Sequence, residues 1–254
     1  MQWKGSILLV LVFMLLHFEG VSQQTIYDEP TILYGKGLQG GIHMHPHGWG
    51  LNIHSSKTLT VDKTFLYGIE ILGMKHPKEV KQPNRFFEDS RRFTYGKLNS
   101  FYIFRPMIGT KRMLTDKLRK NGVEVSVHAS IGPSLGVTKP IYLEIRKEGD
   151  INNDFLDVEP YDPTIHNLTN IYGRASDFLG FNKLKLRPGL YTKLGLYLEN
   201  SPNQKGIMGL ETGISMDAFL REVPIMALEK NKRFFFSFYV NVFIGKRYNR
   251  TLDE

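Results

Sequence analysis

The stretch that most constrains the fold is FFFSFYVNVFIGK, which runs from Phe234 to Lys246. Every second side chain is large and apolar, whereas the side chains between them mix aromatic rings with serine, asparagine and glycine. Alternation at period two predicts a β-strand whose two faces meet different surroundings. The pattern alone does not say which face is inside. The apolar face consists of Phe234, Phe236, Phe238, Val240, Val242 and Ile244.

The same alternation recurs along the chain, which predicts an all-β fold of about eight strands. In 190–199, for example, leucines alternate with Tyr191, Lys193, Gly195, Tyr197 and Glu199. The faces of the segment 97–108 are not resolved by the pattern. The other predicted strands lie near 37–44, 48–55, 65–74, 97–108, 123–137, 207–218 and 234–246.

The connections between these strands differ in length in a regular way. Those at 75–95, 148–187 and 221–232 are long or intermediate, and most of the others are short. Alternate connections of an up-and-down barrel lie at the same end, so this pattern predicts an antiparallel up-and-down barrel with long loops at one end. The tight HPHG turn and the connection 110–122 depart from it. We also expect a short helix over Ala175 to Leu184.

The first residues predict export. Lys4 precedes the apolar run from Ile7 to Leu16, and the small residues Gly20 to Ser22 follow. This pattern is typical of a secretory signal peptide, and the run is short for a spanning helix. We therefore divide the chain into a signal peptide (1–22), an N-terminal segment (23–33), a transmembrane β-barrel (34–248) and a polar C-terminal tail (249–254). With no cysteine, the exported chain has no disulfides.

Two kinds of barrel fit the alternation: a lipocalin-type barrel with an apolar interior, and a membrane barrel with an apolar exterior. The glycines of the mixed face favour the second, because the axis of an eight-stranded barrel has little room for side chains. We expect the apolar face of 234–244 to contact lipid, and the mixed face to form a polar network that fills the lumen. The charged members of that network are Glu70, Arg105, Glu124, Lys193, Glu199, Glu211, Asp217 and Arg247. The glycines are Gly48, Gly50, Gly132, Gly136, Gly195, Gly209 and Gly213.

Several segments carry a family resemblance: GWGLNI, MKHPKEV, YGKLNSFY, SLGVTKPIYLEI, IYGRASDFLGFNKLKLRPGLYTKLGL, LETGISMDAF and FYVNVFIGKRYN. With them the chain resembles the small outer-membrane β-barrel proteins of Gram-negative bacteria, in particular an uncharacterised subgroup from gliding and gut-dwelling lineages. The resemblance implies a fold and a location in the bacterial outer membrane, without a defined reaction. The chain departs from the usual terminal aromatic residue of such barrels, since NRTLDE follows Tyr248.

Histidines and serines offer two alternatives with chemistry. His43, His45, His47 and His54 lie close in sequence and could bind a transition metal, although a polar hairpin tip in which Pro46 sets the turn also explains them. Glu124, Ser126, His128 and Ser130 share one strand face and could serve a lipid-modifying enzyme. Same-face neighbours on a strand are roughly 6 to 7 Å apart, which is too far for a direct serine–histidine hydrogen bond. We expect no cofactor.

The net charge of +8 and the pI near 9.4 allow nucleic acid as a partner. An exported chain without a nucleic-acid module makes anionic lipid headgroups the better interpretation. Basic residues of the 75–95 loop could bind lipopolysaccharide phosphate or an acidic partner, or simply be solvated. They are Lys75, Lys78, Lys81, Arg85, Arg91 and Arg92.

The sequence therefore predicts an integral outer-membrane barrel that has a plugged lumen and no catalytic role. Its expected partners are outer-membrane lipid and other outer-membrane proteins, as an accessory or structural subunit of an envelope assembly for protein insertion, secretion or transport. The alternatives are a small pore and a lipid-modifying barrel enzyme.

Overall fold

A computed structural model of the chain describes residues 35–87, 89–115, 122–146, 156–200, 205–227 and 229–248. The predicted signal peptide, N-terminal segment and C-terminal tail lie outside these residues. No helix in the described ranges is both long and apolar enough to cross a membrane.

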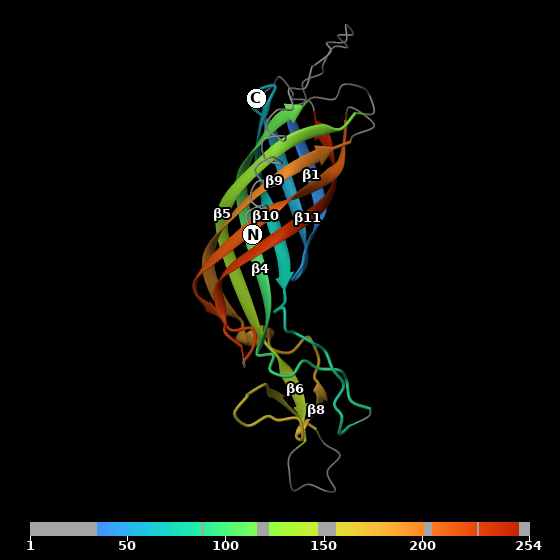
Figure 1. The fold of residues 1–254 in the computed structure, drawn as a ribbon, viewed down its shortest axis with the longest axis vertical. Coiled ribbons are helices and arrows are strands. Elements are labelled where there is room, and N and C mark those ends of the chain that lie inside the picture. The colour runs from blue at the N-terminus through green and yellow to red at the C-terminus, as the bar shows by residue number, and fades with distance from the viewer. Residues whose placement is uncertain are drawn as a thin grey trace, which may run out of the picture. The chain divides into compact units, whose positions relative to one another are not determined.

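Eight antiparallel strands close into a barrel in the order β1-β11-β10-β9-β5-β4-β3-β2 (Figure 1). Each strand pairs with its predecessor and its successor among the barrel strands, and β1 pairs with β11 to close the ring. The predicted up-and-down topology is confirmed. The barrel strands are β1 (Lys36–His45), β2 (Gly48–Thr58), β3 (Lys63–Met74), β4 (Asn99–Thr115), β5 (Glu124–Pro140), β9 (Lys185–Glu199), β10 (Gly206–Val223) and β11 (Lys232–Tyr248).

The strand β4 is longer than the sequence pattern predicted. Alternation continues past Ile108, because Gly109, Lys111 and Met113 turn away from the exposed side chains between them. The connection to β5 is correspondingly shorter than the predicted 110–122. The faces that the pattern left unresolved are also fixed, with Arg105 pointing inward.

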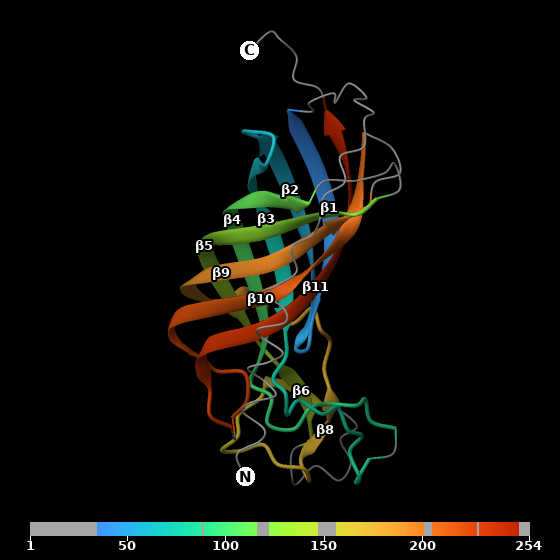
Figure 2. The same ribbon diagram turned by 45° about the horizontal axis from the view of Figure 1, so that its top comes forward.

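The barrel has two unlike ends (Figures 1 and 2). The connections from β3 to β4, β5 to β9 and β10 to β11 leave from one end, which we call the loop end. The tight turn between β1 and β2 lies there too, and its position is fixed by a 2.8 Å hydrogen bond from the Lys75 N–H to the His47 carbonyl. The opposite end, which we call the turn end, holds the first residue of β1 and the last residue of β11.

The β5–β9 connection contains a second, smaller sheet that the sequence did not predict. Its strands β6 (Tyr142–Ile145), β7 (Asp157–Pro160) and β8 (Ile171–Arg174) pair in the order β7-β6-β8. The sheet has its own core of Phe93, Leu143, Ile145, Tyr161 and Ile171. The expected helix over 175–184 is wrong, since only a 3₁₀ turn, η1 (Phe181–Lys183), forms there.

Backbone hydrogen bonds tie the small sheet to the loop end of the barrel. The Ile141 N–H donates to the Leu98 carbonyl at 3.0 Å, and the Leu98 N–H donates to the Ile225 carbonyl at 2.9 Å. The Ala227 N–H reaches the Gly96 carbonyl at 2.7 Å. Three connections that are distant in sequence thus brace one another at the loop end of the barrel.

Candidate functional site in the barrel lumen

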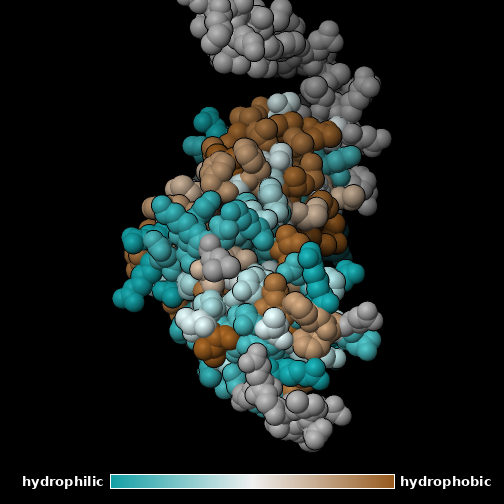
Figure 3. Space-filling model, turned by 60° about the horizontal axis from the view of Figure 1, so that its bottom comes forward, coloured by the Kyte–Doolittle hydropathy of each residue, from teal (hydrophilic) through white to brown (hydrophobic). Residues whose placement is uncertain are grey.

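The outer wall of the barrel is apolar. Phe234, Phe236 and Phe238 of β11 are 65%, 54% and 64% exposed, and leucines of β9 and isoleucines of β2 and β3 are exposed in the same way. Figure 3 shows hydrophobic surface gathered on the barrel wall, with mostly hydrophilic surface nearer the loop end. Exposed patches of this extent favour contact with hydrocarbon over contact with water. Also exposed on this wall are Val240, Val242 and Ile244, together with the aromatic side chains Trp49, Tyr67, Tyr102 and Tyr248.

The centre of the lumen is a layer of buried charge, which we call the central ionic layer: Glu70, Arg105, Lys193, Glu211 and Asp217. Arg105 donates from Nε to Asp217 Oδ1 at 2.9 Å, forms a second bond to the other Asp217 oxygen, and lies 3.4 Å from Glu70. Lys193 donates to Glu70 at 2.7 Å and lies 3.2 Å from Glu211. A bidentate arginine–carboxylate pair is among the strong charge-assisted contacts. Both cations therefore bridge two carboxylates.

Other polar side chains complete the coordination of Glu211. The Tyr239 hydroxyl donates to it at 2.7 Å, His128 Nδ1 lies at 2.7 Å, and the Asn241 amide donates at 3.1 Å. Asn241 in turn accepts a 2.6 Å hydrogen bond from Asn52. Buried charge persists when it is both paired and hydrogen-bonded, and this carboxylate meets both conditions.

The other carboxylates of the layer have polar neighbours of their own. Ser134 donates to Asp217 at 2.9 Å, and His54 Nε2 lies 3.6 Å from Glu70. His43 from β1 stacks on Tyr239 with ring centroids 4.9 Å apart. All eight barrel strands consequently contribute a side chain to one interior layer.

An apolar cap covers the central ionic layer toward the loop end. Phe101 and Phe219 meet edge to face at 5.4 Å between ring centroids, and Phe235 packs against both. Ile225 and Met226 of the β10–β11 connection belong to the same cluster. The connection therefore supplies part of the seal. The buried members of the cap are Leu72, Met74, Phe101, Ile103, Phe219, Val223, Ile225 and Met226.

Toward the turn end the lumen holds an aromatic layer and then a second set of charges. Tyr197 and Phe243 stack at 4.3 Å, and the Tyr197 hydroxyl donates to Gln39 at 2.5 Å. Beyond them lies the turn-end ionic layer, which consists of Lys111, Glu124, Glu199 and Arg247. Lys111 lies 3.1 Å from Glu124 and 3.7 Å from Glu199, and Arg247 also pairs with Glu199.

Glycines give these large side chains room to cross the lumen. A Cβ at Gly195 would overlap the Tyr239 hydroxyl, and one at Gly209 would lie 2.6 Å from the Phe243 ring. Both are closer than side-chain atoms pack. The glycines of the mixed face thus allow neighbouring strands to carry tyrosine, phenylalanine and arginine into an eight-stranded interior.

The eight charged residues predicted for the lumen all lie inside it, but in two layers. Glu70, Arg105, Lys193, Glu211 and Asp217 form the central one, while Glu124, Glu199 and Arg247 face the turn end with Lys111. Lys111 is not among the predicted eight, because the predicted strand ends at residue 108 whereas β4 continues to Thr115. The sequence names His54 and His128 but not the carboxylates that they contact, because these contacts, like that of Asn241, depend on the pairing register of distant strands.

The histidine cluster does not assemble into a metal site. The rings of His43 and His45 are 5.9 Å apart at their centroids, and those of His45 and His47 are 6.4 Å apart. His54 lies opposite Gln39 across the hairpin, away from His43. Within the described ranges, no group of three or more histidine, cysteine or acidic side chains is placed to hold a metal ion.

The serines and the histidine of β5 do not form a catalytic set. His128 Nδ1 is engaged by Glu211, and its Nε2 has no hydrogen-bond partner among the described residues. Ser126 donates to Glu124 at 3.0 Å. A serine–histidine nucleophile needs the two side chains within hydrogen-bond reach, and among the described residues Ser126 and Ser134 donate to carboxylates while the Ser130 hydroxyl has no partner.

The basic loop residues remain at the surface, where Lys75, Lys78, Lys81, Arg85, Arg91 and Arg92 are all exposed. Lys78 pairs with Glu229 at 2.8 Å. Lys97 is different, because it is largely buried in the loop end and pairs with Glu79. Burial lowers the pKa of the Lys97 ammonium group, and the Glu79 carboxylate opposes that shift.

An apolar wall around a polar, filled interior defines a membrane-spanning β-barrel of eight strands. Comparison with protein-family models finds no match, and comparison with curated proteins finds none either. Among solved structures the chain is similar to Ail, the attachment invasion locus protein of Yersinia pestis, at 10% identity, with a TM-score of 0.40 over 85% of this chain and 100% of that one.

Two further solved structures are similar over 85% of this chain. Neisserial surface protein A has 8% identity and a TM-score of 0.39 over 97% of its own length. The outer membrane protein OprG from Pseudomonas aeruginosa has 8% identity and a TM-score of 0.36 over 97% of its own length. These proteins are small outer-membrane β-barrels, the class that the sequence resembles.

Proposed function

We propose that this chain is an integral barrel of the bacterial outer membrane with a sealed lumen, which serves as a non-catalytic accessory subunit of an envelope assembly. The assembly would be one for protein insertion, secretion or transport. The proposal rests on the predicted export signal, on the apolar outer wall, and on a lumen that the described side chains fill.

The observation that carries the proposal is the filling of the lumen. The apolar cap, the central ionic layer and the aromatic layer lie across the barrel in succession, and Arg105, Glu70 and Asp217 are no more than 1% exposed. Breaking buried pairs of this kind to open a path would be strongly unfavourable. A barrel sealed in this way acts through its outer surface and its loops.

The loop end supplies a structured surface for such contacts. Residues 75–98, the small sheet and the β10–β11 connection brace one another through backbone hydrogen bonds and a shared apolar core. Ile165, Phe178 and Phe181 are 60%, 85% and 59% exposed in this region. Exposed aromatic and aliphatic side chains on a rigid frame are typical of interaction surfaces.

The first experiment is purification of a tagged copy from gently solubilised outer membranes, followed by mass spectrometry. We expect a stoichiometric set of outer-membrane proteins to be recovered with it. The matched control is a tagged barrel of similar abundance from the same membrane. Recovery of this chain with lipid alone would contradict the proposal.

Conductance in planar bilayers separates the proposal from the small-pore alternative. We expect no steady openings from the purified barrel, since the cap and the two ionic layers block the axis. Steady single-channel currents would overturn the sealed lumen. An altered lipid profile on deletion of the chain, restored by the wild type but not by a His128→Gln variant, would instead favour the lipid-modifying enzyme.

A further inference from the structure

The seam at which the barrel closes joins two strands of unequal length. β1 pairs with β11 from Lys36, opposite Tyr248, to Met44, opposite Val240, and the chain then turns into β2. β11 extends to Lys232 and pairs with β10 along that extension. Residues 232–239 therefore have a partner strand on the β10 side and none from β1 on the other. We call this segment the open edge of β11.

The backbone groups at the open edge can be assigned from the ladder. The Arg247 N–H donates to the Lys205 carbonyl at 2.7 Å, on the β10 side, and the Tyr239 carbonyl accepts from the Thr212 hydroxyl of β10 at 3.1 Å. Since these directions alternate along an antiparallel strand, even-numbered residues face the other way. Phe234, Phe236 and Phe238 thus aim their N–H and carbonyl groups at the open edge, where no described residue hydrogen-bonds to them.

The composition of the open edge is unusual for an unpaired strand. Proteins commonly protect such edges with lysine, proline or a bulge. Here Lys232, Arg233 and a register shift mark only the start of the edge, and in the following FFFSFY the three outward phenylalanines are all more than half exposed. A long, hydrophobic strand with unpaired backbone groups is a template for pairing with another chain. In a membrane the need for a partner would be greater still.

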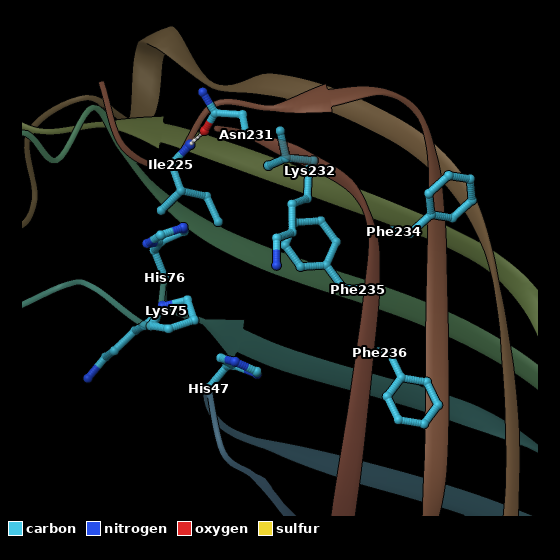
Figure 4. Close-up of a pocket in the computed structure, with 11 residues that line it drawn as sticks. His47, Lys75, His76, Ile225, Asn231, Lys232, Phe234, Phe235 and Phe236 are labelled. Carbon is cyan, nitrogen blue, oxygen red and sulfur yellow. Dashed lines mark hydrogen bonds between the residues drawn. The ribbon is translucent and has the colours of Figure 1, made fainter. Parts of the chain in front are cut away.

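A small cavity of about 70 Å³ adjoins the open edge. Figure 4 shows Ile225, His76 and Lys75 along one side of it and Phe235 beside Lys232 on the other, with Phe234 and Phe236 pointing away. The hydrogen bond from the Ile225 N–H to the Asn231 side chain, at 2.9 Å, holds the connection that forms its upper rim. The cavity lining thus combines apolar side chains with the two ammonium groups of Lys75 and Lys232.

The charge of the cavity is not balanced by its neighbours. Lys75 and Lys232 line it, and neither forms an ion pair with a described carboxylate. No described acidic side chain lines it, and of the carboxylates on nearby loops Glu79 pairs with Lys97 and Glu229 pairs with Lys78. A carboxylate is the ligand that such a cavity complements.

We propose that the open edge of β11 is a docking site at which an extended segment of a partner protein adds as a further strand and places a carboxylate in the adjoining cavity. The backbone groups of Phe234, Phe236 and Phe238 would supply the ladder, and Lys75 and Lys232 would fix its register. This inference rests on the proposed function, because it names the place where the assembly partner binds.

Site-specific photocrosslinking in cells tests the site directly. A photoreactive phenylalanine analogue at position 236 is compared with the same analogue at position 244. Both side chains point outward and are 54% and 67% exposed, but Ile244 lies opposite Gly40 of β1, so its edge is covered. We expect a discrete protein adduct from position 236 only. Adducts with lipid alone, with a second copy of this chain, or equally from both positions would overturn the proposal.

Substitution separates the backbone contribution from the side chain. Phe236→Pro removes the N–H that faces the open edge without touching the β10 ladder, a place where proline is tolerated. We expect it to lower partner recovery about tenfold, whereas Phe236→Leu, which keeps the N–H, stays within about twofold of wild type. Equal recovery with the two variants, both folded by heat-modifiable gel mobility, would refute strand addition.

The cavity is tested with paired neutralisations. Lys75→Gln with Lys232→Gln should lower recovery about fivefold and weaken its dependence on salt. The control, Lys57→Gln with Lys246→Gln, changes two exposed lysines near the turn end. If the tagged wild type recovers partners but none of these variants differs from its control, the docking site is wrong and the proposed function stands. If the wild type recovers no partner, both fail.

Discussion

The two ionic layers of the lumen contain the same kinds of ion pair but differ in their exposure to water. In the central layer Arg105, Lys193 and Glu211 are each 1% exposed. In the turn-end layer the side chains of Lys111 and Arg247 are 13% and 23% exposed. Each layer links strands that are far apart in sequence through cations that touch carboxylates. The difference teaches that water, more than the number of ion pairs, decides what each charge contributes.

The physical reason is the cost of leaving one charge alone. A buried pair gains little over a well-packed apolar pair, but removing one partner leaves an uncompensated charge in a medium that solvates it poorly. Near the opening, water replaces the lost partner. Four cations of decreasing burial, taken from the centre to the surface, therefore form a graded test.

The largest effect is expected for Arg105→Met. Asp217 loses both of its bonds to the guanidinium group and Glu70 loses one of its two cations. We expect the free energy of unfolding to fall by about 3 to 5 kcal/mol, measured by urea unfolding in lipid vesicles. Adding Asp217→Asn should recover part of the loss, because it removes a stranded charge. A loss no larger than that of an exposed lysine would break the comparison.

Lys97→Met tests whether burial alone, outside the lumen, makes a charged side chain important for stability. Lys97 lies at the loop end, yet its side chain is only 14% exposed. We expect a loss of about 1 to 3 kcal/mol near neutral pH, since Glu79 is left without its partner. Local hydrogen exchange of the small sheet would report it. Lys97→Arg, which keeps the charge, is the control.

The same variant carries a pH signature. Burial lowers the pKa of Lys97 in the folded chain from the ordinary 10.5. At a pH between the folded and the unfolded pKa of this lysine, the unfolded chain therefore binds more protons than the folded chain. The contribution of Lys97 to stability then increases as pH rises toward 10.5. Between about pH 8 and about pH 10, the unfolding midpoint of wild type should therefore rise relative to that of Lys97→Met, which lacks the titrating group. If the gap in unfolding midpoint between wild type and Lys97→Met is the same at both pH values, the lysine is solvated.

Arg247→Gln should cost less than either. Glu199 keeps Lys111 at 3.7 Å, and the side chain of Arg247 is already 23% exposed. We expect a loss of about 1 kcal/mol or less in the same urea titration. A loss that matches that of Arg105→Met would mean that the turn end is as dry as the centre.

The smallest effect is expected for Lys78→Gln, whose side chain is 67% exposed in its pair with Glu229. Exposed pairs contribute about 0 to 1 kcal/mol, and the change should fall at the lower end of that range. The midpoint of urea unfolding should equal that of wild type within error at low salt and at high salt. A salt-dependent loss would reveal a loop network that the ion pairs described above do not include.

Much of the barrel could be predicted from sequence because a strand with unlike faces leaves its period in the residue order. Phe234 to Ile244 showed this most clearly, and Leu190 to Glu199 repeated it. The small sheet could not be predicted in the same way. Four residues such as Ile171–Arg174 are too few to show a period, and they become a strand because Leu143 and Phe93 offer a core.

For the candidate site too, some features could be predicted from a single strand and others could not. Alternation indicates which face Glu70 or Lys193 occupies, because that depends only on the strand that carries it. It cannot indicate that Glu211 meets His128, 83 positions away, because that contact depends on the register of β5, β9 and β10 together. Lys111 was missed for a simpler reason, since the end of β4 has few apolar side chains to mark it.

The central ionic layer also bears on how the barrel is assembled. Asn52 and Asn241 are 189 positions apart, and Arg105 and Asp217 are 112 apart, so neither contact exists until the ring has closed. A strand inserted one residue out of register would turn every side chain to the opposite face, sending Glu70 or Lys193 into hydrocarbon. The buried charges thus destabilise intermediates with an out-of-register strand, and they stabilise only the closed barrel in which all eight strands are in register.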